Sequence, residues 1–372
     1  MVPLQATAAQ FPLLWHEVIK MNEKTRRREF LSKTASAALA APLLSQIGHA
    51  GSSGSAPGPQ GQAKTKIKKI AVEEHWTADD VRLAIGREKS AMSDRQVDLG
   101  EIRLGEMDAA GIQMQVIANS SYQGITDTAK AITLAKKNND YLAERIAKYP
   151  TRFAGLAALP TQDPKAAADE FERAVRQLGF KGAMIEGQDH VNFEFLDSQK
   201  FWGLWERAAA FEAPIYLHPA VPPPDSLKII EAKPELQSLA WLGGVYTATQ
   251  ALRLMVSGVF DAFPKATLIL GHVGELLPYW LARLDEQARG WKVKKSPSGY
   301  VKNNILVTTS GLYLPETLVC AISALGEDRV LFATDYAAVT GTVAVEMVER
   351  TPISDAVKEK IYHLNAERWL RV

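Results

Sequence analysis

Residue types that bind metals or carry protons stand at the ends of several short apolar runs in this sequence. Three of its seven histidines occupy such positions. In chain order, the polar residues that close the runs are Glu73, Glu74 and His75, then Asn119, Glu186, His218, His272, Thr308 to Ser310, and Asp335. If the runs are strands of a parallel barrel, their carboxyl ends meet at one mouth, where such barrels carry out their chemistry. We therefore expect these side chains to share a site.

Four of these residues form a pattern typical of a divalent-metal site. Side chains two apart on a strand face the same way, so Glu73 and His75 point into the barrel mouth and Glu74 points away. A carboxylate and an imidazole from one strand supply half of such a site. His218 and Asp335 can supply the third and fourth ligands. Each residue alone has a plainer explanation, such as an ion pair, a core histidine or a helix cap. The metal site is favoured because these separate explanations would all have to apply at once.

The elements that must position these residues alternate eight times along the chain. Short apolar runs, rich in β-branched residues and bounded by turn residues, are typical of buried parallel strands. Their alternation with helical patterns favours a closed α/β barrel over an open doubly wound sheet, and no phosphate-binding glycine pattern follows the first run. The predicted strands are Ile70–Val72, Gln115–Ala118, Phe153–Ala158, Ala183–Ile185, Ile215–Leu217, Thr267–Leu270, Ile305–Val307 and Val330–Phe332.

Helical periodicity fills the intervals between these strands. Asp163-Pro164 places a capping carboxylate before a proline at the first helical position, and Gly179 follows the last periodic residue of that helix. The clearest predicted helices are Asp127–Lys148, Pro164–Leu178, Ser198–Phe211, Leu252–Phe263, Leu276–Arg289, Pro315–Leu325 and Ser354–Leu370.

The first 66 residues are predicted to lie outside the barrel. Arginines 26 to 28, followed by Phe30-Leu31 and a weakly apolar stretch to Ile47, resemble a twin-arginine export signal within residues 1–50. Met21 is then the more natural start, and cleavage after Ala50 is plausible. Residues 51–66 read as a flexible linker, and residues 67–372 as the catalytic barrel. We expect an exported or periplasmic protein, or a cytoplasmic one if the segment is instead a basic amphipathic helix.

Composition excludes several classes of protein. The 372 residues carry a formal charge of +1, which argues against a nucleic-acid partner. The apolar stretch near the N-terminus is too short for a stable membrane span, which needs about 20 strongly apolar residues. Cys320 is the one cysteine, so neither a disulfide framework nor a thiolate zinc cluster can form. We expect Cys320 to be a buried helical thiol.

Several motifs in register resemble the amidohydrolase superfamily, in the branch of γ-resorcylate, 5-carboxyvanillate and aminocarboxymuconate-semialdehyde decarboxylases. The resemblance covers essentially Lys68 to Val372. It is closest to the γ-resorcylate decarboxylases, whose first strand also carries Glu-x-His where other members have His-x-His. The motifs are Ala71-Val-Glu-Glu-His75, Tyr216-Leu-His-Pro219, Leu252-Arg-Leu-Met255, Gly271-His-Val-Gly-Glu-Leu-Leu-Pro278 and Thr334-Asp-Tyr336.

The resemblance implies a distorted (β/α)8 barrel that holds one Zn²⁺ or Mn²⁺. Glu73, His75, His218 and Asp335 match the family's ligand positions. His272 matches a histidine beside the metal that contacts substrate or water, and Glu275 matches its orienting partner. Family members are usually dimers or tetramers, so a homo-oligomer is expected.

Two reactions fit this constellation. The first is non-oxidative decarboxylation of a phenolic or related unsaturated carboxylic acid, with Asp335 as the proton donor that the family mechanism suggests. The second is hydrolysis of a lactone, amide or similar bond, with Asp335 handling the protons of a water molecule. Glu73 favours decarboxylation by resemblance, and export favours hydrolysis. A binding protein without turnover is disfavoured, because binding needs no His272–Glu275 pair.

Departures from the family pattern fall at the pocket rim. Ala337 stands where the decarboxylases usually have proline, Glu186 stands where asparagine is expected, and the segment from residue 188 to residue 197 is shorter than in γ-resorcylate decarboxylases. Trp76 is predicted either to flank the substrate ring or to belong to the core. For Arg253 a helix-surface ion pair is favoured over contact with a substrate carboxylate.

Overall fold

The computed structural model describes residues 67–372 with the exception of residues 121, 188–190, 193, 221, 232 and 238. The predicted export signal and linker lie outside these residues, so both stay predictions.

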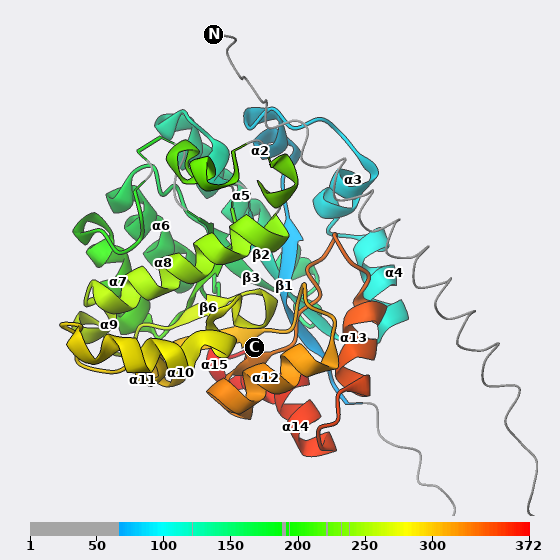
Figure 1. Cartoon of the computed structure of the whole chain (residues 1–372). Helices are drawn as coiled ribbons and strands as arrows, with labels where there is room; N and C mark the ends of the chain where they lie inside the picture. Colours follow the sequence, from blue (N-terminus) through cyan, green and yellow to red (C-terminus); the bar gives the residue numbers. More distant parts are fainter. Residues whose placement is uncertain are drawn as a thin grey trace, which may run out of the picture. The chain divides into compact units, whose positions relative to one another are not determined.

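Eight parallel strands form the centre of the described chain, in the order β1 to β8 (Figure 1). Two backbone hydrogen bonds join the last strand region to the first: Val72 N donates to Phe332 O and His75 N to Tyr336 O, both at 2.9 Å. The predicted closed barrel is thereby confirmed. The strands are β1 (Ile70–Trp76), β2 (Met114–Asn119), β3 (Phe153–Ala158), β4 (Ala183–Glu186), β5 (Ile215–His218), β6 (Leu268–Leu270), β7 (Ile305–Thr308) and β8 (Val330–Leu331).

Helices surround the strands, as expected for a (β/α)8 barrel (Figure 1). The predicted cap is confirmed, since the Asp163 side chain accepts hydrogen bonds from the backbone N–H groups of Lys165 and Ala166. The α-helices are α2 (Asp79–Ala84), α3 (Ala91–Val97), α4 (Glu101–Ala110), α5 (Thr128–Lys148), α6 (Pro164–Gln177), α7 (Trp202–Phe211), α8 (Gly244–Val256), α9 (Val259–Ala262), α10 (Leu277–Gln287), α11 (Pro297–Asn304), α12 (Pro315–Leu325), α13 (Gly341–Arg350), α14 (Asp355–Glu359) and α15 (Asn365–Leu370).

Three predictions on helices and burial were wrong in detail. The helix predicted at Leu252–Phe263 is two helices, because Gly258 adopts a φ of +84° between α8 and α9, and α8 begins eight residues earlier, at Gly244. The predicted terminal helix consists of α14 and α15 joined by a π-helical turn. Cys320 lies on α12 as predicted, but it is half-buried rather than buried.

The apolar core has two parts. One set of side chains fills the barrel interior and includes Val72, Met184 and Tyr216, and a larger set lies between the strands and the helices. The register of β1 against β2 shifts between Ala71 and Glu74. This bulge places Glu73 and His75, rather than Glu74, on the inner side of the barrel above Val72. Within the described residues, no helix combines the length and the hydropathy that a bilayer crossing requires.

Candidate metal centre

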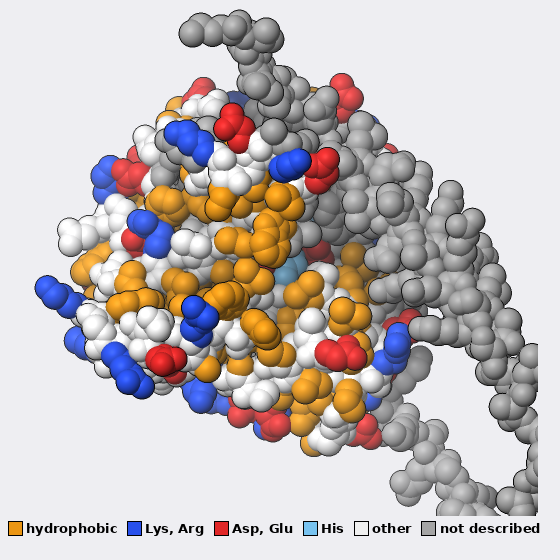
Figure 2. All heavy atoms as spheres, in the orientation of Figure 1, with side chains coloured by type: hydrophobic (Ala, Val, Ile, Leu, Met, Phe, Trp, Pro, Cys, Tyr) orange, Lys and Arg blue, Asp and Glu red, His pale blue; other side chains and the backbone are white. Residues whose placement is uncertain are grey.

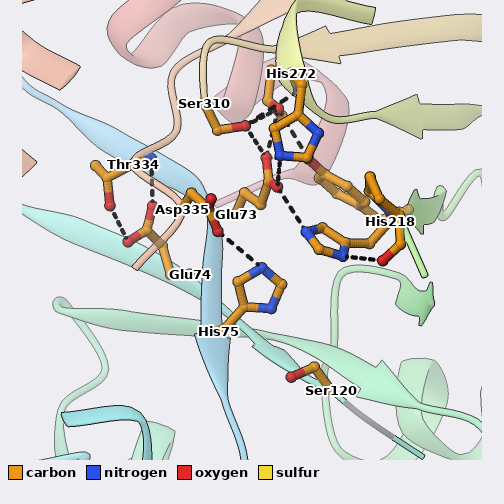
Figure 3. Close-up of polar contacts among 12 residues, drawn as sticks. Glu73, Glu74, His75, Ser120, His218, His272, Ser310, Thr334 and Asp335 are labelled. Atoms are coloured by element: carbon orange, nitrogen blue, oxygen red, sulfur yellow. Dashed lines mark hydrogen bonds and ion pairs between the residues drawn. The ribbon is translucent and has the colours of Figure 1, made fainter. Parts of the chain in front are cut away.

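Four side chains from three parts of the barrel converge at its mouth. Glu73 and His75 extend from β1, His218 ends β5, and Asp335 follows β8 (Figure 3). One ligand atom from each residue can be chosen such that all four atoms lie within 4.8 Å of one another. Glu73 Oε1 is 3.3 Å from His218 Nε2, and His75 Nε2 is 3.4 Å from Asp335 Oδ1. The structure thus brings together the four residues that the sequence predicted as ligands.

The donor set fits one divalent cation. Three of the converging atoms, Glu73 Oε1, His75 Nε2 and His218 Nε2, are buried and have no hydrogen-bond partner among the described residues. Buried polar atoms are almost always partnered, so three unpartnered atoms aimed at one point indicate a ligand. Two carboxylates and two imidazoles suit Zn²⁺ and Mn²⁺ alike.

The second oxygen of Glu73 is held by hydroxyl groups. Oε2 accepts a hydrogen bond of 2.8 Å from Thr308 Oγ1, and the hydroxyls of Tyr216 and Ser310 donate to the same atom. Burial alone would raise the pKa of Glu73, but His272 and His218 outweigh it and hold the pKa below its usual range. Oε1 therefore remains available as an anionic ligand atom.

Sequence reasoning assigned no role to these three hydroxyls. Thr308 and Ser310 were recognised only as strand-end residues, and Tyr216 was not singled out. The available signal was position, because Tyr216 lies two residues before His218 on β5 and so faces the same side.

The imidazole of His218 is oriented by its own neighbour. Its Nδ1 lies 3.0 Å from the carbonyl oxygen of Pro219, which can only accept a hydrogen bond. Nδ1 therefore carries the proton, and Nε2 presents its lone pair to the other ligand atoms.

Asp335 lies beyond the last strand rather than at its end. β8 ends at Leu331, and Asp335 follows in a loop with a φ of +56°. Glu74 holds this loop, since its carboxylate accepts hydrogen bonds from Thr334 N at 2.9 Å and Thr334 Oγ1 at 2.7 Å. Glu74 thus points away from the cluster, as predicted. Burial raises the pKa of Glu74 to about 8, although the hydrogen bonds from Thr334 and the charge of Arg103 lower it.

His272 and Glu275 form a pair beside the cluster. His272 Nδ1 is 2.8 Å from Glu275 Oε1, and His272 Nε2 is 3.6 Å from Glu73 Oε1. Burial alone would lower the pKa of His272. The carboxylates of Glu275 and Glu73 outweigh this effect and raise the pKa to about 10. His272, Val273, Gly274 and Glu275 all have positive φ, so a left-handed turn at the end of β6 presents both side chains to the site.

The other residues named in the sequence analysis lie in the core, on a helix or at the barrel mouth. Asn119 is buried and donates to Asn139 Oδ1. Trp76 is a core residue, because it is buried, donates to Val97 O and stacks on Tyr141. Arg253 forms the expected ion pair, with two 2.9 Å hydrogen bonds to Asp197. Glu186 is half-buried at the end of β4.

Comparison with known proteins identifies the family to which this barrel is similar. The profile of the amidohydrolase family matches residues 70–372. A γ-resorcylate decarboxylase from Polaromonas sp. (strain JS666) is 37% identical over 323 residues, which are 82% of this chain and 98% of the relative.

Two solved structures resemble the barrel over similar lengths. The 2,6-dihydroxybenzoate decarboxylase from Rhizobium has a TM-score of 0.77 at 36% identity, over 82% of this chain and 98% of its own. The 5-carboxyvanillate decarboxylase from Novosphingobium aromaticivorans, complexed with manganese and 4-hydroxy-3-methoxy-5-nitrobenzoic acid, has a TM-score of 0.77 at 31% identity, over 82% and 97%. With the profile spanning the barrel and relatives this similar along nearly their whole length, the chain belongs to the amidohydrolase family, in the branch that includes γ-resorcylate and 5-carboxyvanillate decarboxylases.

Proposed function

We propose that this protein is a divalent-metal-dependent, non-oxidative decarboxylase of phenolic carboxylic acids. The observation that carries the proposal is the buried cluster of Glu73, His75, His218 and Asp335 with the His272–Glu275 pair beside it. The relatives named above, which share this barrel, carry the names of decarboxylases of hydroxylated aromatic acids.

The proposed roles follow from the positions of the side chains. Glu73, His75, His218 and Asp335 would hold a divalent ion, which would supply Lewis-acid attraction for the anionic substrate. Asp335 gives a proton to the ring carbon that bears the carboxylate, and regains one from water after turnover. As that C–H bond forms, the C–C bond to the carboxylate breaks, its electron pair returns to the ring, and carbon dioxide leaves. His272 Nε2, oriented through Glu275, donates a hydrogen bond to the phenolic oxygen.

The proposed metal is Mn²⁺, with Zn²⁺ as the alternative. The donor set alone suits both ions. Manganese is present in the solved structure of the 5-carboxyvanillate decarboxylase, which supports the first choice. Elemental analysis of the purified protein, followed by reloading of the metal-free form with each ion, tests this choice.

The decisive experiment supplies the metal-loaded protein with hydroxybenzoates and aryl lactones and records carbon dioxide and acid release separately. Decarboxylation predicts carbon dioxide from hydroxybenzoates and, in D335N, a folded protein without turnover. Acid release from lactones without carbon dioxide would support a hydrolase instead. Ordinary turnover by D335N would remove Asp335 from the proton-transfer role.

We also propose that the chain forms a homo-oligomer and is exported. Large apolar side chains such as Ile229, Tyr279 and Trp241 are exposed, and Figure 2 shows hydrophobic side chains around a hollow with a histidine at its floor. Such surfaces favour burial against another protein surface. The arginine motif at residues 26 to 28 supports export by the twin-arginine route.

A further inference from the structure

The end of β4 places an additional carboxylate on the inner face of the barrel mouth. β4 and β5 pair in parallel, with Met184 opposite Tyr216 and Glu186 opposite His218. Met184 and Tyr216 belong to the cluster that fills the barrel interior. Side chains two residues further along each strand face the same way. Glu186 therefore points to the side on which His218 reaches the metal cluster.

The carboxylate of Glu186 has no partner there. Glu186 is half-buried, and among the described residues no group donates a hydrogen bond to its carboxylate or pairs with it. Its Oε atoms are also not among the four ligand atoms that gather at the cluster. Its charge nevertheless reaches the site, since it acts electrostatically on the imidazole of His75.

The charges at the mouth determine what this carboxylate can receive. Within the described residues, Glu73, Asp335 and Glu275 each lie within 4 Å of a histidine nitrogen. Glu186 forms no such ion pair, so its carboxylate is free to meet a ligand. A carboxylate accepts hydrogen bonds and cannot donate them, and it repels a second anion nearby.

We propose that Glu186 is a specificity-determining residue, which accepts a hydrogen bond from a ring hydroxyl of the substrate and disfavours rings with a second carboxylate. This inference rests on the proposed function for the kind of substrate. The inference distinguishes between the two substrates named for the relatives, because 2,6-dihydroxybenzoate has one carboxylate and 5-carboxyvanillate has two. It predicts that this pocket takes rings with one carboxylate, as in 2,6-dihydroxybenzoate.

Binding of nitrophenols to the manganese-loaded protein tests the proposal without turnover. The probes are 2-nitrophenols with a second hydroxyl at each free ring position, each compared with its methoxy counterpart, and 4-hydroxy-3-methoxy-5-nitrobenzoate as the ring with a carboxylate. At one ring position the wild type should bind the hydroxyl compound roughly ten- to a hundredfold more tightly than the methoxy compound, as expected for a hydrogen bond to a charged acceptor.

E186Q should reduce the preference for the hydroxyl over the methoxy compound to a few-fold. It should also bind 4-hydroxy-3-methoxy-5-nitrobenzoate more tightly, relative to the dihydroxy probe, than the wild type does. E346Q, which removes an exposed carboxylate on α13, is the matched control and should keep the wild-type ratios. The proposal is overturned if the wild type shows no hydroxyl preference at any position, if E186Q keeps it, or if E186Q loses manganese, since Glu186 would then be a ligand.

The same pairs of compounds as hydroxybenzoates give a second readout through carbon dioxide release. If no hydroxybenzoate loses carbon dioxide while the nitrophenol ratios respond to E186Q, the proposed decarboxylation fails and the role of Glu186 stands. If carbon dioxide is released but the kcat/KM ratio of hydroxyl to methoxy compound is the same in E186Q and wild type, the role of Glu186 fails and the proposed function stands.

Discussion

Thr308 donates a 2.8 Å hydrogen bond from its Oγ1 to Oε2 of Glu73, across 235 residues of sequence. β7 thereby fixes a metal-ligand candidate on β1. The carboxylate is divided between two tasks: Oε2 receives hydroxyl groups and Oε1 faces His218 and His272. The orientation of Glu73 thus depends on residues that do not themselves reach the proposed ion.

Thr308→Val should weaken metal binding while the barrel stays folded. Valine keeps the shape but removes one donor to Glu73 Oε2, and partners of this kind are worth about ten- to a hundredfold in metal affinity. Competition between the protein and a chelator for Mn²⁺ measures the change. Thr249→Val, on the exposed side of α8, is the control. Equal affinity in T308V and wild type would show that the hydroxyl does not support the ligand.

Gly311→Ala should displace His272. Gly311 has a φ of +72°, and a Cβ there would lie 2.1 Å from His272 Cδ2. The left-handed conformation costs an L-residue about 1–2 kcal/mol, and the contact forces the imidazole to move. Because a small misplacement of a positioned group can cost about a hundredfold in rate, we expect a loss of kcat of at least that order.

Metal content should stay near the wild-type value in G311A, since the three atoms nearest to the new methyl group all belong to His272, which is not one of the four ligand candidates. Gly105→Ala in α4 provides the comparison, because nothing lies within 4 Å of a Cβ at that position. Wild-type kcat in G311A would mean that the exact place of His272 is unimportant for turnover.

Arg103→Met should destabilise the fold. The Arg103 guanidinium is fully buried, donates to the carbonyl oxygens of His75 (2.7 Å) and Asp98 (2.9 Å), and stacks on the Tyr336 ring at 4.0 Å. Burial lowers its pKa to about 10, so it remains a cation at neutral pH. Removing it leaves buried acceptors unpaired and Glu74 without its nearby cation, at a cost of roughly 3 kcal/mol.

Urea unfolding of R103M and wild type measures this cost, and Arg176→Met on the exposed surface of α6 is the control. A difference below about 0.5 kcal/mol, the usual range for surface changes, would contradict the structural role of Arg103.

The metal-free protein should lose stability as the pH rises above neutrality. The folded pKa of His272 is raised to about 10 from 6.5. A group whose folded pKa is raised stabilises the fold fully below its unfolded pKa, and this stabilisation is lost as the pH rises through the folded pKa. In the wild type the contribution should fall between pH 6.5 and 10 by a few kcal/mol, on the order expected for such a shift.

His272→Gln removes the titrating group, so the difference in unfolding free energy between wild type and H272Q should shrink across that interval. Chemical unfolding at several pH values, with chelator present, gives the difference directly. A gap that is constant from pH 6 to pH 10 would be incompatible with a protonated His272 in the folded state.

The parts of the site that were predictable from sequence are those set by local spacing. Glu73 and His75 follow from the two-residue period of a strand, and His218 follows from its place at the end of an apolar run. The barrel follows from alternating strands and helices. Each of these inferences uses residues only a few positions apart.

The parts that were missed depend on contacts between distant residues. The bulge in β1, the donation from Tyr216 to Glu73 and the approach of Gly311 to His272 arise only when strands are packed together. The left-handed turn contains three non-glycine residues, His272, Val273 and Glu275, and residues of these types rarely adopt a positive φ. Only Gly274 among the four turn residues gives a sequence signal for it, and a single glycine is a weak one. α13 begins after Thr340, whose side chain makes no capping hydrogen bond, so no capping signal marks its start.

Anomalous diffraction from crystals of the manganese-loaded protein tests the central claim most directly. The account predicts one strong manganese peak within coordination distance of Glu73 Oε1, His75 Nε2, His218 Nε2 and a carboxylate oxygen of Asp335. A loaded protein whose manganese lies elsewhere, or at a position that two or more of these side chains do not reach, would contradict it.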